Sequence, residues 1–138
     1  MTSPPEAPRG PLHDASEAFA LLDAWDRQGR DQVARANAIQ SRLQALRVSV
    51  WSPGHEVAVT VDHTGLVVDL EFTDRALDRG PAALGETITR TARSALEQLA
   101  VQAEEQVVDA VGEGDALGRS AIAHYRSSLL GAAEDQGR

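Results

Sequence analysis

Hydrophobic and polar residues alternate strictly along residues 56–72, EVAVTVDHTGLVVDLEF. Valines alternate with small or polar residues before the segment His63–Gly65, and apolar residues recur at every second position after it. A period of two over this length is typical of a half-buried antiparallel hairpin. A two-residue loop at Thr64–Gly65 makes one face of that hairpin apolar and so fixes its register. The predicted cross-strand pairs are Val61 with Val68, Val59 with Leu70, and Val57 with Phe72.

Helical periodicity replaces the alternation on both sides of the hairpin. Apolar residues recur at heptad spacing from Ala15 to Leu46, with Asp14 or Ser16 as the N-cap of a long helix. Gly29 lies inside this stripe, and a glycine costs about 1 kcal/mol in a helix interior, so a kink or break is expected there. A second long apolar stripe begins after Pro81, a residue suited to the first helical position. Gly112 is expected to end this second helix.

These elements predict an α+β fold of the order α-β-β-β-α, in which a three-stranded antiparallel meander separates two long helices. The first strand is expected at residues 47–52, and residues 52–55, SPGH, are expected to form a type II turn before the hairpin. Residues 1–13 hold four of the six prolines and are expected to form a disordered lead. Residues 14–112 would form the domain, and residues 113–138 an extension with a short helix capped by Asp115.

The order of these elements resembles that of the YbaB/EbfC family of small bacterial nucleoid-associated proteins, in particular its actinobacterial members. The resemblance covers roughly Ala20 to Val111. It implies a cytoplasmic, nucleoid-located protein that binds DNA as a homodimer with little sequence preference. An alternative that the actinobacterial members suggest is a protein-interaction, chaperone-like or regulatory role beside type VII secretion. The matching residues are Val57, Val59, Val61, Gly65, Val68, Leu70 and Phe72, then Asp74 to Leu77, and then the segment ALGETITRTARSALEQ.

Element lengths independently favour a second copy of the chain as partner. A helix from Ala15 to Leu46 spans about 48 Å at 1.5 Å per residue. A strand of eight residues spans only about 27 Å, so the sheet cannot cover the whole apolar stripe of either helix. An uncovered stripe of that size normally marks a partner surface. The residues expected at a homodimer interface are Trp25, Ile39, Leu43, Leu46, Trp51, Ile88 and Leu99.

Net charge bears on the DNA-binding interpretation. The chain carries −8, whereas phosphate neutralisation by basic side chains supplies most non-specific affinity for DNA. The charge is unevenly distributed, because residues 27–52 hold five arginines against Asp31 alone, and residues 97–118 hold six acids and no arginine. Arginines beside a helical seam could equally form interhelical ion pairs. The candidate DNA-binding residues are Arg27, Arg30, Arg35, Arg42, Arg47, Arg90 and Arg93.

Catalytic, metal and cofactor sites are not expected, and neither is a membrane partner. The chain has no cysteine, and His55 and His63 bound one strand about 27 Å apart, too far to share a metal. Asp62 and His63 lie at a hairpin tip, where Asp is a common turn former. The carboxylates of the polar sheet face could bind a divalent cation, but a solvated face is the commoner reason for such a cluster. No apolar run approaches the roughly 20 residues of a membrane span.

Overall fold

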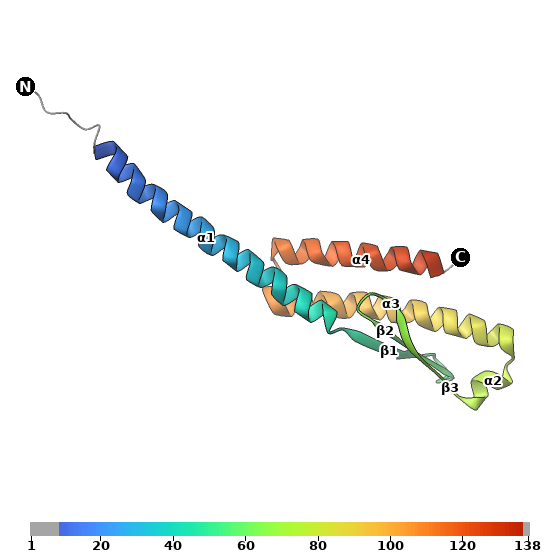
Figure 1. Ribbon diagram of the computed structural model, residues 1–138. Coiled ribbons are helices and arrows are strands. Elements are labelled where there is room, and N and C mark those ends of the chain that lie inside the picture. Colours follow the sequence, from blue (N-terminus) through green and yellow to red (C-terminus); the bar gives the residue numbers. More distant parts are fainter. Residues whose placement is uncertain (1–8, 137–138) are drawn as a thin grey trace, which may run out of the picture. The chain divides into compact units, whose positions relative to one another are not determined.

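The computed structural model describes residues 9–136, with side chains from 15 to 131. The described residues divide into two compact units, with the boundary between Ala36 and Asn37. The predicted α+β order of helix, three-stranded antiparallel sheet and helices is confirmed (Figure 1). The elements are α1 (Arg9–Gln44), β1 (Arg47–Trp51), β2 (Val57–Asp62), β3 (Val67–Phe72), α2 (Asp74–Asp78), α3 (Pro81–Val111) and α4 (Ala116–Gln136).

Helix α1 starts earlier than the sequence suggested. It begins at Arg9 rather than near Asp14. Pro11 is compatible with this start, because the first N–H groups of a helix have no partner within the helix and a proline there removes no hydrogen bond. Residues 1–8 of the predicted lead lie outside the described residues. The helix also continues through Gly29 without the expected break. In the first unit, the side chains from 15 to 34 are all exposed.

The three strands form a meander in the order β1-β2-β3. Two predicted pairs are confirmed, Val57 with Phe72 and Val59 with Leu70. The third is wrong, because Val61 pairs with Val67 and the ladder shifts by one residue between Thr60 and Val61. The hairpin loop has three residues, since the amide of Asp62 donates to the carbonyl of Leu66 at 2.9 Å. The bulge adds one residue to β3 and so restores the register of the two outer pairs.

The predicted type II turn before β2 is also wrong. A type II turn needs a positive φ at its third residue, but here His55, one position after Gly54, has φ 55°. The amide of His55 donates to the carbonyl of Ser52 at 2.8 Å, which closes the turn. The Ser52 hydroxyl oxygen accepts hydrogen bonds from the amides of Glu56 and Val57, at 3.0 and 3.1 Å. These bonds satisfy the amides that lead into β2.

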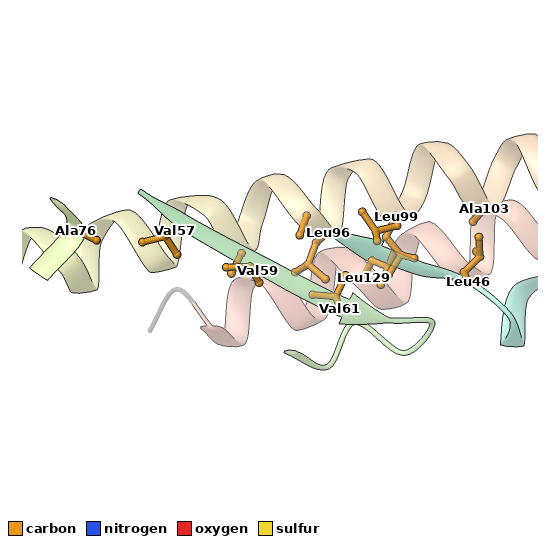
Figure 2. Close-up of a cluster of buried hydrophobic side chains, with 12 residues drawn as sticks. Leu46, Val57, Val59, Val61, Ala76, Leu96, Leu99, Ala103 and Leu129 are labelled. Atoms are coloured by element: carbon orange, nitrogen blue, oxygen red, sulfur yellow. The ribbon is translucent and has the colours of Figure 1, made fainter. Parts of the chain in front are cut away.

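The core lies between one face of the sheet and helix α3. Alternate valines of β2 are fully buried, and α3 packs mainly across β1 and β2 (Figure 2). Gly80 precedes Pro81 at the start of α3 and Gly112 ends it, as predicted. The apolar stripe of α3 therefore supplies the second wall of the core. The buried cluster consists of Leu46, Val48, Val57, Val59, Val61, Ala76, Ala92, Ala95, Leu96, Leu99, Ala103 and Leu129.

Helix α4 completes this core from the C-terminal side. Its first turn is capped by Asp115, whose carboxylate accepts a hydrogen bond from the amide of Gly118 at 2.9 Å. The helix then runs beside α3 and buries Leu129 in the core (Figure 1). The Tyr125 hydroxyl donates a hydrogen bond to the carbonyl of His63 at the hairpin tip. Gly65, with φ 87°, lets the hairpin approach, since a Cβ there would lie 3.2 Å from Leu129.

Candidate nucleic-acid interface

Arginines of the first unit lie on the exposed surface of α1. Arg27 donates to Asp23 at 2.9 Å, and Arg30 forms the equivalent pair with Asp26 one turn along. Both are pairs between residues i and i+4 of one helix. Exposed pairs of this kind contribute only about 0.3–0.5 kcal/mol, so a phosphate could replace the carboxylate at little cost. Arg35 is half-buried in the same unit.

Arg42 and Arg47 differ in what holds them. Arg42 donates to Asp109 at 2.7 Å and to Gln106 at 3.0 Å, so it ties the end of α1 to the end of α3. This is the interhelical ion pair that was the alternative to DNA contact. Arg47 is exposed at the start of β1, opposite Asp62 in the ladder. Arg42 therefore has a structural partner that a DNA phosphate would have to displace.

The first half of α3 carries the other two predicted arginines. Arg90 donates to Glu86 at 2.8 Å in an exposed i, i+4 pair. Arg93 is exposed, and it forms no ion pair with the residues whose side chains are described. Both arginines project from a rigid helix whose opposite face is buried in the core. That placement suits contacts with a DNA backbone, because the helix fixes the spacing of the two charges.

Two further arginines near Arg90 were not among the predicted residues. Arg75 donates to the carbonyl of Gly54 at 2.6 Å, and Arg79 donates to Glu56 at 2.8 Å. Arg79 and Arg90 share the wall of a hollow of about 140 Å³ beside the turn that precedes β2. The hydrogen bond from Arg79 to Glu56 raises the pKa of this guanidinium. The segment TDRALDRG contains both arginines, which is the signal that sequence reasoning overlooked.

Acidic surfaces limit where DNA could lie. The later half of α3 carries the exposed Glu104, Glu105 and Asp109, of which Glu104 pairs with Arg126 at 3.0 Å. At the hairpin tip, a hydrogen bond from Thr64 lowers the pKa of the Asp62 carboxyl, which therefore stays negative at neutral pH. Like charge would repel phosphate at both places. Outside these two places, predicted arginines lie on α1 and on the first half of α3.

The predicted interface residues fall into two groups. Ile39, Leu46 and Leu99 are buried within the second unit, and Leu43 and Ile88 pack partly against the same core. A side chain covered by its own chain has little area left for a partner. The two tryptophans remain exposed, and Trp51 packs on His55 with ring centroids 5.6 Å apart.

Metal-binding groups do not converge in the described part of the chain. Among the described side chains, no three His, Asp or Glu residues are close enough to hold an ion. The side chain of His13 lies outside the described residues. The ring of His55 packs on Trp51. Within residues 9–136, no helix has both the length and the hydropathy needed to cross a membrane.

Comparison with known proteins adds a family to this geometry. Residues 27–114 match the model of the YbaB/EbfC DNA-binding family. Neither a curated protein nor a solved structure matches the chain. The matched range includes all seven predicted arginines together with Arg75 and Arg79, and it ends before α4.

Proposed function

Because this chain belongs to the YbaB/EbfC DNA-binding family, we propose that it is a nucleoid-associated protein that binds DNA as a homodimer with little sequence preference. The match over residues 27–114 is the observation that carries this proposal. A location at the nucleoid, and so in the cytoplasm, follows from it. The actinobacterial type of member is likewise proposed, from the sequence resemblance alone.

The arginines of α2 and α3 are suited to contact with the DNA backbone. Arg75, Arg79, Arg90 and Arg93 belong to α2, α3 and the short segment between them, and these elements pack against each other. Arginine is well suited to phosphate because its planar guanidinium can donate two parallel hydrogen bonds. Phosphate contacts position a protein on DNA but carry no direct sequence information. A surface of this kind therefore predicts binding with little sequence preference.

Net charge sets the expected strength of binding. A homodimer would carry 2 × −8 = −16, so long-range electrostatics oppose the approach of DNA. Affinity should consequently be weak at physiological salt. Each phosphate contact adds about −0.9 to the slope of log affinity against log salt concentration. Binding should fall steeply as salt rises from low to moderate concentration.

The test compares two double variants that remove the same charge. Arg90→Ala with Arg93→Ala takes two arginines from α3 within the family range, and one of them has a glutamate partner. Arg119→Ala with Arg126→Ala takes two from α4 outside that range, and again one has a glutamate partner. Fluorescence anisotropy with duplexes of several sequences, titrated at a series of salt concentrations, measures the affinity of each protein.

The α3 variant should weaken binding equally for every duplex and reduce the salt slope by about 1.8, the value for two lost contacts. The α4 variant should bind like the wild-type protein. Equal loss in both variants would mean that only net charge matters. If the wild-type protein shows no binding at roughly tens of micromolar in low salt, the DNA-binding proposal fails.

Exposed apolar side chains on β3 support the homodimer. Leu70 and Phe72 are 41% and 45% exposed, although they lie directly opposite the buried Val59 and Val57. They are uncovered because β3 is an edge strand and α3 packs mainly on β1 and β2. An exposed apolar edge strand is a ready template for pairing with another chain. A second copy could cover it by antiparallel pairing of the two β3 strands.

Sedimentation equilibrium tests this arrangement. The wild-type protein should have a mass near twice 14.7 kDa at micromolar concentration. Leu70→Asp should weaken the dimer while each subunit stays folded, because it places a charge in the proposed interface and not in the core of one subunit. Asp69→Asn, which alters the next residue along β3, serves as the control and should stay dimeric. A wild-type mass of 14.7 kDa would refute the homodimer.

The alternative role beside type VII secretion stays a hypothesis from the sequence. No specific feature of residues 9–136 favours it over DNA binding.

A further inference from the structure

Helices α3 and α4 leave an apolar groove between them in the second unit. Its volume is about 340 Å³. Val101 and Leu130 remain largely exposed there, so the described residues do not fill it. The apolar lining residues are Leu96, Ala100, Val101, Leu129 and Leu130, and the charged ones are Arg93, Glu97 and Arg126.

A row of large apolar side chains on α1 is uncovered in the same way. Phe19, Leu22 and Trp25 are each more than half exposed, and Phe19 reaches 72%. Their spacing of three residues places them along one face of the helix. No described side chain covers them, since all those from residue 15 to 34 are exposed. Three adjacent large apolar side chains left in water point to a missing partner.

We propose that the α3/α4 groove of one copy of this chain binds the helical segment Ala15–Asp26 of a second copy. An amphipathic helix that lays its apolar face into a hydrophobic groove is a recurrent mode of protein recognition. Phe19, Leu22 and Trp25 supply the three anchoring side chains. The contact rests on the proposed homodimer, because it needs two copies, but it adds an interface separate from β3.

The dimensions of the two surfaces agree. Along α3 the groove extends from Arg93 to Val101, which is about 12 Å at 1.5 Å per residue. The row from Phe19 to Trp25 extends about 9 Å by the same rise. All three anchors can therefore lie within the groove at once. Exchange between two copies would fill both grooves symmetrically, as expected of a closed dimer.

Charge also favours this occupant. The segment ASEAFALLDAWD carries three acids, Glu17, Asp23 and Asp26, and no base. The charged residues of the groove are two arginines and one glutamate, which leaves a net positive charge. Asp23 and Asp26 also pair with arginines of their own helix, but those pairs are exposed and weak. Arg126 already pairs with Glu104 at 3.0 Å, so Arg93 is the groove arginine that the acids of the segment can approach.

The segment and one wall of the groove lie outside the residues that match the family, whereas the α3 wall lies within them. The segment Ala15–Asp26 precedes the matched range 27–114, and α4, which forms one wall of the groove, follows it. The segment Ala15–Asp26 and helix α4 would both be explained if the segment of one copy covers the groove that α4 forms in the other.

Disulfide trapping tests the contact directly, because the chain has no cysteine of its own. A chain with Phe19→Cys, Leu22→Cys or Trp25→Cys is mixed with a longer, tagged chain that carries Val101→Cys, and the mixture is oxidised. All four positions are exposed, so the substitutions should not disturb folding. Ala20→Cys, an exposed position on the other face of the same helix, is the matched control. A disulfide requires Cα atoms within about 7 Å, so the yield reports close approach.

The expected result is a mixed-size, disulfide-linked dimer with at least one of the three anchor positions and none above background with Ala20→Cys. Equal yields for the anchors and the control, or no product at any anchor, overturn the proposal. A chain carrying both Trp25→Cys and Val101→Cys that closes an internal disulfide instead would show that the segment fills its own groove, which also overturns it.

Sedimentation equilibrium of the unoxidised proteins separates this proposal from the β3 homodimer. A dimeric mass without trapping at the anchors means that the groove contact alone fails. A dimeric mass that Leu70→Asp does not weaken, with trapping at the anchors only, means that the groove contact is supported while the β3 homodimer fails. A monomeric mass without trapping means that both fail.

Discussion

Shortening Leu129 to alanine tests whether α4 is part of the folding core. Leu129 is 4% exposed and contacts the buried cluster from the C-terminal side (Figure 2). Its neighbours include Leu96, and the backbone of Gly65 approaches both side chains closely. If α4 packs there, replacing Leu129 with alanine removes buried side-chain carbons and leaves a cavity in the core.

The size of the effect follows from the burial. Leucine to alanine removes about three carbon groups, at about 0.8 kcal/mol each when fully buried, or about 2.4 kcal/mol. Residual cavities raise measured costs to about 2.7–5 kcal/mol. Leu129 lies near the end of the last helix, where the surroundings can relax, so we expect about 3 kcal/mol. For a chain of this length that corresponds to a fall in Tm of about 10 °C.

Urea unfolding followed by far-ultraviolet circular dichroism measures the loss as a shift in midpoint at constant m-value. Leu130→Ala is the matched control, since the next side chain is 61% exposed and its loss should cost less than about 0.5 kcal/mol. Low protein concentration keeps contacts between molecules from adding to either value. Equal, small losses in both variants would refute the docking of α4.

Tyr125→Phe should lower the free energy of unfolding by about 1 kcal/mol, because it removes the hydrogen bond that the Tyr125 hydroxyl donates to the carbonyl of His63.

Leu99→Asp should unfold the protein, because the position is fully buried and a carboxylate there would be neither hydrated nor paired. Retention of the native circular dichroism spectrum would contradict this prediction. Gly65→Ala should lower the urea midpoint, since φ is 87° and the new Cβ would lie 3.0 Å from Leu96; an unchanged midpoint would argue against the close approach. Hydrogen bonding lowers the folded pKa of Asp62, so its stabilising effect is present above the unfolded pKa of about 3.9 and is lost as pH falls through the lower folded value. Asp62→Asn should therefore be less stable than the wild type at pH 7, and urea midpoints should show this difference shrinking as pH falls below about 3.9. Chelators and added zinc or calcium should leave Tm unchanged, and a shift of several degrees with any divalent ion would direct attention to the carboxylates of the sheet.

Periodicity predicted the elements of the fold but not its irregular connections. The alternation in residues 56–72 identified the hairpin and its two outer pairs, because a slip of one residue would take Leu70 and Phe72 off the face of the β2 valines. The three-residue loop was missed because the Asp62 carboxylate accepts from the amides of Thr64 and Leu66, and this bonding is not visible in the alternation. The position of α4 was missed because an amphipathic pattern shows that a face is buried and not which surface covers it.

The candidate site shows the same limit for charged residues. The sequence identifies every arginine, but it does not reveal that Arg42 meets Asp109, a residue 67 positions away. Nor does it reveal that Arg79 lies beside Arg90 at the hollow next to β2. Such long-range neighbours depend on how helices cross the sheet. Pairs within one helix turn, such as Arg30 with Asp26, were in principle readable from their spacing of four.

The bulge in β3 determines which single-residue deletion the hairpin can tolerate. Val68 is the residue that the ladder skips, since Val67 pairs with Val61 while Asp69 pairs with Thr60. An in-frame deletion of its codon would leave the three-residue loop in place and join the two halves of the ladder without any shift. Deleting the codon for Asp69 instead would leave Val68 to pair with Thr60, with an apolar side chain in place of a carboxylate. Val68 is thus the position in this hairpin where a deletion of one residue keeps the strand pairing and removes only a half-exposed valine side chain.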